Sequence, residues 1–468
     1  MKKIFSFVFM ALTFSFYLSP AQSASLENAD IVIRGGTIIT MDGSFGIIEN
    51  GAVVIKDGRI VGLGLATEID SKYRAATVID ALDDVIMPGL INAHTHVPMS
   101  LFRGIADDLP LMEWLQKYIF PAEAKNVDEE FVRWGARLGC LEMIRGGTTT
   151  YVDMYYFENA IAEETSKAGM RAILGETILD FPAPDNKSWP EGIKSVERFV
   201  QRWKEDQLII PAIAPHAPYT VSREHLMEAH DISVRYGIPL VTHIAETKDE
   251  VNTIQKKYGL SPVAYLDSIG FLDKQVISAH VVWPSESDIK TLASRSVGVI
   301  HCPQSEMKLA SGISPVPKML RAGINIGLGT DGAASNNDLD LWEEMDTAAK
   351  LQKVSMMDPA VLNAKEALSM ATIMGARAIH LDKEIGSLEI GKRADIIIVG
   401  MDSAHQTPIY NWYSALVYST KSSDVKSVII NGKVIMKDRK VLTIDETSIR
   451  AKALEYRNKI QKSLSGKN

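Results

Sequence analysis

Cysteine is nearly absent from this chain: only Cys140 and Cys302 occur among its 468 residues. A disulfide-stabilised scaffold of this length would need several cysteine pairs, so that class of protein is excluded. Cys140 falls in a helical pattern and Cys302 lies at the end of a strand-like run. We expect both to be packed free thiols.

The sequence also lacks an excess of positive charge. It has 50 lysines and arginines against 58 aspartates and glutamates, a net charge of −8, and its isoelectric point is near 5.8. Proteins that bind nucleic acid or anionic membranes carry a basic surface, so neither partner is expected. A small-molecule substrate fits this composition better.

Long apolar runs are missing except at the N-terminus, where Lys2 and Lys3 precede an apolar stretch from Ile4 to Leu18. This stretch is too short for a comfortable membrane span, and small residues up to Ala24 follow it. A basic start, an apolar middle and a small-residue end are typical of a secretory signal peptide. We expect residues 1–24 to be one and the protein to be exported, periplasmic or secreted, with an uncleaved anchor as the alternative.

The rest of the chain has the composition of an ordinary globular protein, with 46% hydrophobic and 23% charged residues. Residues 25–86 and 385–445 alternate short β-rich runs with glycine turns. We expect these two segments to pair into one small composite β-sandwich domain. Residues 446–468 are predicted to form a C-terminal helix.

Between these segments, residues 87–384 alternate strand-like and helical runs. One predicted helix covers residues 128–145, where Phe131, Trp134, Leu138 and Leu141 recur at helical spacing. The eight predicted strands are 85–91, 148–154, 171–179, 208–214, 239–243, 276–280, 297–301 and 324–331. Eight strands with intervening helices predict an α/β fold, a closed (β/α)8 TIM barrel.

Five titratable residues follow strand-like runs in this region: His94, His96, His243, His280 and Asp331. His94 and His96 are separated by one residue, so both imidazoles project to the same side of a strand and one metal can take both. Barrel enzymes keep their chemistry at the strands' C-terminal ends. Histidine nitrogens and an aspartate oxygen that leave one position open for water suit a catalytic zinc ion, which indicates a metal-dependent hydrolase.

Longer motifs give the chain a family resemblance. Residues 88–96, Gly386 to Asp395 and Asn431-Gly432-Lys433 resemble the amidohydrolase superfamily. Residues 94–99, 103–104, 215–219, 308–312 and 329–337 are similar to the methylthioadenosine/S-adenosylhomocysteine deaminase group and its triazine-hydrolase relatives. Binuclear members place a carboxylated lysine at the end of the fourth strand, where this chain has His216, so the resemblance implies one metal. Cys302 and Glu306 depart from the asparagines that are frequent in the family.

The predicted chemistry divides these residues into metal ligands and proton carriers. We expect His94, His96, His243 and Asp331 to hold one divalent metal, most simply zinc, although iron and manganese also suit such ligands. Asp331 would take a proton from the attacking water, and His280 would orient that water. Glu246, three residues after a ligand, would protonate the ring nitrogen and the leaving exocyclic nitrogen.

Substrate contacts follow from the resemblance and from strand positions. Trp114 and Glu123 belong to a segment predicted to cover the pocket, where they would pack on the purine or thioalkyl group and hold ribose hydroxyls. His216 would donate to a ring nitrogen. Glu176 is expected near the mouth, where it would repel the carboxylate of S-adenosylhomocysteine and favour neutral or cationic substrates.

Three functions remain open at this point. The first is a hydrolytic deaminase of an aminopurine nucleoside of the methylthioadenosine or adenosine type, which releases ammonia. The second is a hydrolase of triazine-like or other heteroaromatic rings, and the third is a binding protein that keeps the fold without catalysis. Glu246 and His280 argue against the third, since a binder needs no water-activating residues. The sequence leaves the oligomeric state undetermined, and a homo-oligomer is compatible with it.

Overall fold

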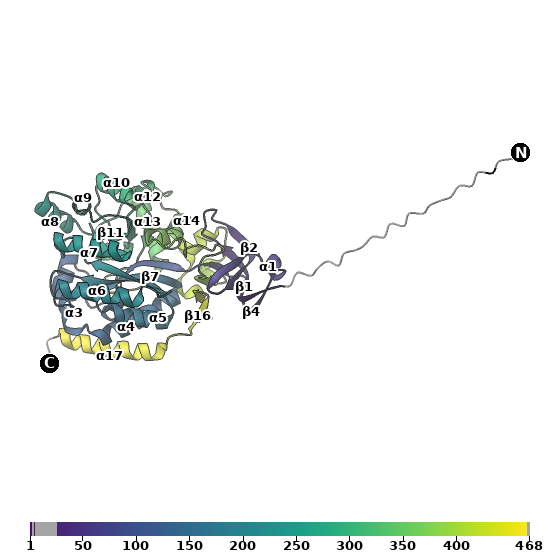
Figure 1. Cartoon of the computed structure of the whole chain (residues 1–468), viewed down its shortest axis with the longest axis horizontal. Coiled ribbons are helices and arrows are strands. Elements are labelled where there is room, and N and C mark those ends of the chain that lie inside the picture. Colours follow the sequence, from purple (N-terminus) through teal and green to yellow (C-terminus); the bar gives the residue numbers. More distant parts are fainter. Residues whose placement is uncertain (2–3, 5–25, 466–468) are drawn as a thin grey trace.

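The computed structural model describes residues 1, 4 and 26–465. The predicted signal peptide, residues 1–24, lies outside the described residues apart from Met1 and Ile4. Figure 1 shows two parts side by side, a large helix-covered barrel and a smaller β-rich part beside it. In the part of the chain described, no helix is both long and apolar enough to cross a membrane.

Eight parallel strands form the barrel, in the order β13-β12-β11-β10-β9-β8-β7-β6. The strands are β6 (Leu90–Thr95), β7 (Thr148–Tyr155), β8 (Arg171–Ile178), β9 (Ile209–Pro215), β10 (Leu240–Ile244), β11 (Val276–His280), β12 (Gly298–His301) and β13 (Ile326–Leu328). The first and last strands meet through Asn92, whose amide donates to Thr330 Oγ1 (2.8 Å) and accepts from the Thr330 N–H (3.0 Å). The predicted (β/α)8 barrel is therefore confirmed.

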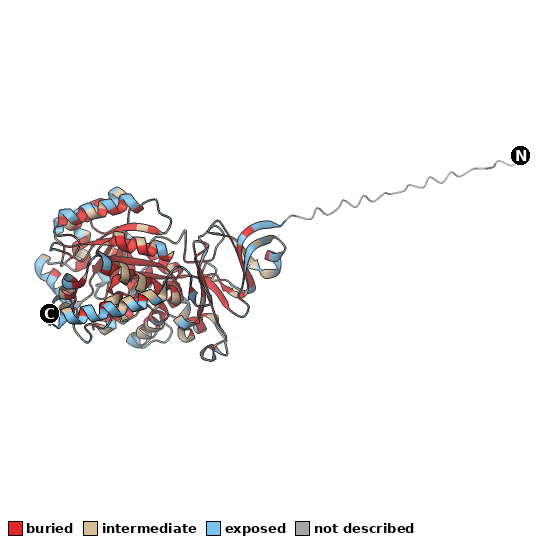
Figure 2. Ribbon diagram, turned by 90° about the horizontal axis from the view of Figure 1, so that it is seen from below, coloured by how far each residue is buried: buried red, intermediate tan, exposed pale blue. Residues whose placement is uncertain are grey.

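Helices cover the outside of the barrel, and Figure 2 shows their exposed faces turned to solvent and their buried faces turned to the strands. Helix α4 (Glu129–Gly146) starts where Asp128 accepts the Phe131 N–H and ends at Gly147, whose φ of 86° suits glycine. It buries Phe131 and Leu141, as their spacing predicted. The other outer helices are α5 (Glu158–Ala168), α6 (Trp189–Trp203), α7 (Arg223–Tyr236), α8 (Lys248–Tyr258), α9 (Pro262–Ser268), α10 (Glu286–Arg295), α11 (Pro303–Lys308), α12 (Val316–Arg321), α13 (Leu341–Met356), α14 (Ala364–Met370) and α15 (Ile373–Ala378).

A segment between β6 and α4 lies over the carboxyl end of the barrel. It consists of short helical pieces: η1 (Val97–Phe102), α2 (Leu111–Glu113), η2 (Trp114–Ile119) and α3 (Phe120–Asn126). Leu111, Trp114, Leu115 and Ile119 from this segment are buried and line the same cavity. The segment therefore forms a cover over that cavity, as the sequence predicted.

Strands from both ends of the chain build the smaller part as one nine-stranded mixed sheet, in the order β17-β16-β15-β14-β5-β1-β2-β3, with β4 paired to β1. The N-terminal strands are β1 (Glu27–Ile39), β2 (Ile47–Lys56), β3 (Arg59–Leu65), β4 (Tyr73–Asp80) and β5 (Val85–Pro88), with α1 (Ala66–Asp70) between β3 and β4. The C-terminal strands are β14 (Ile396–Val399), β15 (Val425–Ile430), β16 (Lys433–Lys437) and β17 (Lys440–Val441). Ile33, Ile55, Ile396 and Ile429 share one hydrophobic cluster, so the two chain ends bury a common core.

Short turns and one long helix complete the chain. The short pieces are η3 (Ala404–Gln406), α16 (Trp412–Ser414), η4 (Ala415–Ser419) and η5 (Ser422–Asp424). Helix α17 (Glu446–Leu464) runs along the barrel in Figure 1 and stacks Tyr456 edge-on against Phe131 of α4, with ring centroids 5.5 Å apart.

The first predicted barrel strand, residues 85–91, is in fact two strands that belong to different sheets. β5 pairs with β1 and β14 in the composite sheet, whereas β6 pairs with β7 in the barrel. Gly89 separates them, and a Cβ added there would lie 2.1 Å from Thr149 Cγ2. Glycine fits at this point because the Thr149 side chain occupies the space that a Cβ would need.

A buried ion pair joins the barrel to the composite sheet. Arg171 Nε and Nη2 donate to the two carboxylate oxygens of Asp395 at 2.8 and 3.2 Å. Asp395 also accepts the Asn431 N–H at 2.7 Å. A two-pronged contact of this kind fixes orientation as well as distance.

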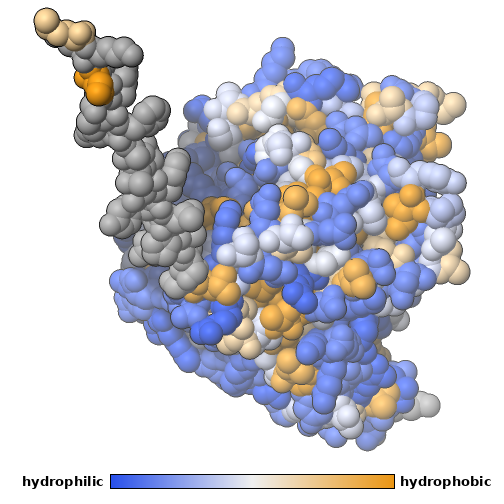
Figure 3. All heavy atoms as spheres, turned by 90° about the vertical axis from the view of Figure 1, so that its right-hand side faces the viewer, coloured by the Kyte–Doolittle hydropathy of each residue, from blue (hydrophilic) through white to orange (hydrophobic). Residues whose placement is uncertain are grey.

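Figure 3 shows the face on the side of the composite sheet. It is mainly hydrophilic, and its apolar residues are scattered or in small groups. Scattered apolar residues are normal on the surface of a folded protein.

Candidate active site

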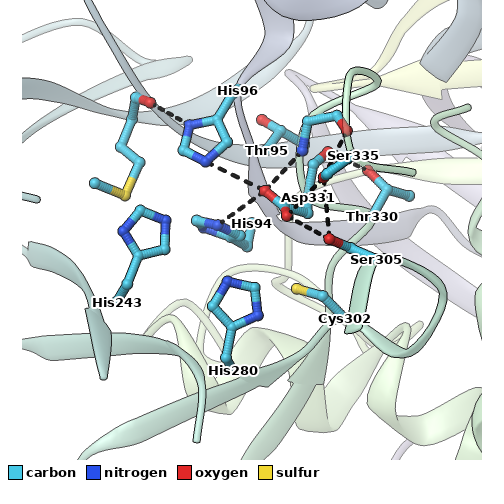
Figure 4. Close-up of polar contacts among 12 residues, drawn as sticks. His94, Thr95, His96, His243, His280, Cys302, Ser305, Thr330, Asp331 and Ser335 are labelled. Carbon is cyan, nitrogen blue, oxygen red and sulfur yellow. Dashed lines mark hydrogen bonds and ion pairs between the residues drawn. The ribbon is translucent and has the colours of Figure 1, made fainter. Parts of the chain in front are cut away.

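Four histidines and one aspartate converge at the carboxyl end of the barrel, as Figure 4 shows. His94 and His96 lie at the end of β6, His243 lies in β10, His280 ends β11 and Asp331 follows β13. The His94 ring centroid is 5.0 Å from those of His96 and His243 and 5.5 Å from that of His280. Two overlapping trios, His94–His243–His280 and His94–His96–Asp331, each bring their ligand atoms within 4.8 Å of one another.

Backbone carbonyls orient two of these rings. His96 Nδ1 lies 2.6 Å from the Met154 carbonyl, and His243 Nδ1 lies 2.8 Å from the His216 carbonyl. A carbonyl can only accept, so each Nδ1 carries a proton, and in the neutral ring each Nε2 keeps a lone pair. Hydrogen bonding of this kind on the outer nitrogen is what metal-binding histidines show.

His94 lies at the centre of the group and is almost fully buried. Neither of its ring nitrogens has a hydrogen-bond partner among the described residues. A buried polar atom without a partner carries a desolvation cost, which a bound ligand can remove.

Asp331 is held in place by hydroxyl groups and by the backbone. Ser305 and Ser335 donate to its Oδ2 at 2.6 and 2.8 Å, and the Gly332 N–H donates to Oδ1 at 2.7 Å. Oδ1 also lies 3.5 Å from His94 Nε2 and 3.2 Å from His96 Nε2. Burial raises the pKa of Asp331, but the two imidazoles outweigh it and hold that pKa well below its ordinary value. The carboxylate is therefore ionised.

Burial and neighbouring carboxylates together set the charge state of the histidines. Burial acts to lower the pKa of His96, but the Asp331 carboxylate outweighs it and raises that pKa above its ordinary value. Burial lowers the pKa of His94 to about 4 and that of His243 well below its ordinary value, so both rings are neutral. Burial also acts on His280, but the nearby carboxylates of Glu246 and Glu306 outweigh it and raise its pKa to about 9. Neutral rings can donate a lone pair to a metal, and the His280 ring is suited to hold a proton.

Glu246 lies beside this group, in the turn after β10. The Glu250 carboxylate fixes the turn by accepting the Ala245 and Glu246 N–H groups, both at 2.8 Å. Glu246 Oε2 is 3.9 Å from His280 Nε2, and the residue is only 5% exposed. Burial raises the pKa of Glu246 to about 7, with His280 acting in the opposite direction. A carboxyl with this pKa can give up and regain a proton at neutral pH.

The backbone around the group adopts a conformation that residues with a side chain rarely take. Ala245, His280 and Asp331 have φ values of 53°, 73° and 61°, in the left-handed region. Such backbone costs about 1–3 kcal/mol per residue and persists only where the surroundings enforce it, most often at functional sites. His280 and Asp331 line the cavity themselves, and Ala245 directly precedes Glu246, which also lines it.

A cavity of about 590 Å³, which opens to solvent, lies above the five residues. Four of the predicted substrate-binding residues line it: Trp114, Glu123, His216 and Glu246. Glu123 accepts the Tyr155 hydroxyl at 2.8 Å, and burial raises its pKa to about 7. His216 Nδ1 lies 3.0 Å from Thr220 Oγ1, and burial lowers the pKa of His216 to about 3. The cavity is lined by apolar and aromatic side chains with a few polar groups among them, as is common in sites for small organic molecules.

Glu176 does not lie at the mouth, so the prediction for this residue is wrong. Its carboxylate points to the outer side of β8, where it accepts the Glu158 N–H (3.0 Å) and the Asn186 amide (3.0 Å). Its neighbour Thr177 lines the cavity instead. Side chains alternate along a strand, so only one of these two neighbours can face the cavity, and it is the threonine.

Several residues that line or support the site were not predicted. Met154, Tyr155, Tyr156 and Tyr219 line the cavity. Ser305 and Ser335 hold Asp331, and Glu250 holds the turn that carries Glu246. Only Tyr219 and Ser335 fell within the motifs quoted for the family resemblance. Cys302 is buried and unpaired, as expected for both cysteines.

Comparisons with known proteins agree with this geometry. The sequence profile described as amidohydrolase family matches residues 85–435. A 5-methylthioadenosine/S-adenosylhomocysteine deaminase of Syntrophobacter fumaroxidans is 48% identical over 419 residues, which cover 90% of this chain and 95% of the relative. The crystal structure of an adenosine deaminase from Xanthomonas campestris with bound zinc is similar, with a TM-score of 0.92 and 37% identity over 93% of this chain and all of that one (100%).

A second solved structure is similar in fold alone. This is an atrazine chlorohydrolase from Arthrobacter aurescens complexed with zinc, at 23% identity and a TM-score of 0.85, which covers 91% of this chain and 100% of that one. The chain therefore resembles deaminases in sequence and in fold, and it resembles triazine hydrolases in fold alone. On the extent of the profile match and of the sequence identity, the chain belongs to the amidohydrolase family.

Proposed function

We propose that the protein is a metal-dependent aminohydrolase that releases ammonia from an aminopurine nucleoside of the methylthioadenosine or adenosine type. The observation that carries this proposal is the convergence of His94, His96, His243, His280 and Asp331 beneath a cavity that Glu246 also lines. The similarity to deaminases named for adenosine-type substrates supports the choice of substrate class.

The side chains fit one divalent metal ion. His94, His96 and His243 would offer nitrogens and Asp331 an oxygen, a set that zinc takes readily and that iron or manganese also accepts. The fit is supported by the nitrogens of His94 that lack a partner and by the outer hydrogen bonds of His96 and His243. A bound metal would supply a Lewis acid that lowers the pKa of coordinated water toward neutrality.

The protein's own groups would carry the protons. Asp331, held ionised, accepts a proton from the water that adds to the amine-bearing ring carbon, and His280 orients that water. Glu246 gives its proton to the adjacent ring nitrogen as the carbon becomes tetrahedral. The carbon–nitrogen bond to the exocyclic amine then breaks, and that nitrogen leaves as ammonia after it takes the proton held by Asp331. Deprotonation of the new hydroxyl restores the carbonyl and returns a proton to Glu246.

The cavity walls suit a nucleoside. Trp114 presents a large apolar face for the purine or a thioalkyl group, and Glu123 offers carboxylate oxygens for ribose hydroxyls. His216, whose Nδ1 faces Thr220, has its Nε2 available for a ring nitrogen. These assignments belong to the proposal and would be tested by binding of nucleosides that lack one of these groups.

The test is ammonia release by the purified, zinc-loaded protein from a panel of substrates. Methylthioadenosine, adenosine and 5′-deoxyadenosine should be deaminated. The corresponding hypoxanthine nucleosides and ammonia should form in equal amounts. Chelation should abolish turnover and added zinc should restore it. Turnover of a triazine alone would instead support the second function, a heteroaromatic-ring hydrolase.

A further inference from the structure

The carboxylate of Glu306 lies between two histidines, on the side of His280 opposite the cavity. Its Oε1 is 3.6 Å from His280 Nδ1, and its Oε2 is 3.0 Å from His301 Nδ1. His280 Nε2 faces the other way, toward Glu246 at 3.9 Å. The His280 ring therefore stands between two carboxylates, one in the cavity and one behind it.

Local structure fixes Glu306 at this place. It is in the first turn of α11, where Oε1 also accepts the Cys302 N–H at 3.0 Å. Glu306 is 1% exposed, and a buried carboxylate is costly unless charged or polar groups compensate it. Among the described residues only the Cys302 N–H donates a hydrogen bond to it, and the two imidazoles lie nearby, with ion-pair distances of 3.0 and 3.6 Å. His301, the last residue of β12, faces this carboxylate from the other side.

We propose that Glu306 is a positioning residue that holds the His280 ring with its Nδ1 proton toward the Glu306 carboxylate, so that Nε2 is presented to the cavity and to Glu246. The proposal rests on the proposed function, in which His280 orients the attacking water. Hydrogen bonds of catalytic groups are often long before substrate binds, which accounts for the 3.6 Å separation. Glu306 acts through His280 and touches no substrate.

Two alternative roles for Glu306 lead to different experimental outcomes. His280, Cys302 and Glu306 bring their ligand atoms within 4.8 Å of one another, so the first alternative is that they bind a second metal ion. The second alternative is that Glu306 only caps α11. Capping needs one acceptor oxygen, which glutamine supplies equally well, whereas positioning of His280 uses the carboxylate charge as well.

The experiment compares Glu306→Gln, Glu306→Met and a matched control, Glu344→Gln, all as zinc-loaded protein. Glu344 is also fully buried (0% exposed) and accepts hydrogen bonds from Gln304 and Asn336, but it is not in contact with His280. With unchanged KM and metal content, kcat should fall by about 10-fold in Glu306→Gln and by about 100-fold in Glu306→Met, the range for residues that orient active-site groups. Glu344→Gln should leave kcat unchanged.

A double-mutant cycle tells whether Glu306 acts through His280. In a His280→Asn background, Glu306→Gln should have almost no further effect on kcat, because the group it positions is gone. An equal loss of kcat in both backgrounds would overturn the proposal, as would full kcat in both Glu306 variants. A second bound metal equivalent that disappears in Glu306→Gln would also overturn it in favour of the metal site.

A spectroscopic measurement keeps the inference testable without turnover. In protein labelled with ¹⁵N-histidine, the His280 ring, assigned by its loss in His280→Asn, should carry a proton on Nδ1 at neutral pH, whether or not Nε2 is also protonated. The Nδ1 signal should change in Glu306→Gln, where the carboxylate that faces it is lost. An unchanged His280 signal would refute the positioning role even if Glu306→Met failed to fold. If the wild type releases no ammonia from any nucleoside, the proposed function is wrong. The His280 signal still tests the positioning role in that case, because it does not depend on turnover.

Discussion

Replacing Glu246 by glutamine should remove catalysis and, at the same time, stabilise the protein at neutral and alkaline pH. The substitution keeps the size and hydrogen-bonding capacity of the side chain and removes its titratable proton. We expect kcat to fall by about 10²-fold or more, the usual scale for loss of a proton-transfer group, while bound metal is retained.

The stability gain follows from the raised pKa of Glu246. Its ordinary value is 4.5 and burial raises it to about 7 in the folded protein. The folded state then binds the proton more tightly than the unfolded chain, so the stabilisation is complete below pH 4.5 and is lost as the pH rises through about 7. The difference between these two pKa values corresponds to about 3 kcal/mol of folding stability. The variant does not lose this stability at high pH, because glutamine is neutral at every pH.

The assay is urea unfolding of metal-free wild type and Glu246→Gln at about pH 4.5 and about pH 8. The difference in free energy of unfolding between the two proteins should grow by about 3 kcal/mol in favour of the variant between these pH values. Glu344→Gln should show a growing difference in the same direction, because burial raises the Glu344 pKa well above its ordinary value. A growth of less than about 1 kcal/mol would refute a strongly raised pKa at Glu246.

Four further predictions concern the metal, specificity, the joint between the two parts, and export. His243→Ala should abolish both bound metal and turnover, measured by elemental analysis and ammonia release; full activity in a chelated sample would contradict this. Glu176→Gln should leave unchanged the ratio of kcat/KM for methylthioadenosine to that for S-adenosylhomocysteine, because its side chain lies outside the cavity. A clear shift in that ratio would show that this carboxylate influences the cavity. Arg171→Met should lower the free energy of unfolding in urea by about 3–5 kcal/mol, because it leaves a buried carboxylate unpaired; a loss near zero would mean that water replaces the guanidinium. We also propose that the chain is exported and cleaved, so mass spectrometry of exported protein should find Gln22 or Ser25 at its N-terminus. An uncleaved chain recovered with cytosolic protein would disprove this.

The histidines and Asp331 could be located from the sequence because each stands at the end of a short apolar run. His94 and His96 are two residues apart, so strand geometry alone places them on one side. Barrel topology then brings the ends of distant strands together. Residues 94, 243, 280 and 331 meet for that reason, although long stretches of chain separate them.

The choice between Glu176 and Thr177 could not be made from the sequence. Every residue of β8 is buried, because helices cover one side of the strand and the barrel interior the other. The alternation of polar and apolar residues that marks the two faces of a strand is therefore missing. The same absence hid the division between β5 and β6, both of which are buried throughout.

Glu306 shows a second limit. The sequence marks it only as a departure from the family's usual asparagine, and its relation to His280 depends on how α11 follows β12. A residue that positions a catalytic side chain is recognised by its distance to that side chain. A local sequence pattern holds no information about this distance. The same applies to Ser305, which reaches Asp331 from this helix.

The pairing of β5 with β14 sets the order in which the composite sheet can be completed as the chain emerges. Residues 85–88 emerge early, yet their partner, residues 396–399, emerges only after the entire barrel. Until β14 is available, the β5 edge of the N-terminal strands has no hydrogen-bonding partner. The barrel can form during this time, because its strands follow one another in the sequence. A nascent chain interrupted before β14 would contain all the barrel strands together with β5 as an unpaired edge strand. Other chains can add strands to such an edge.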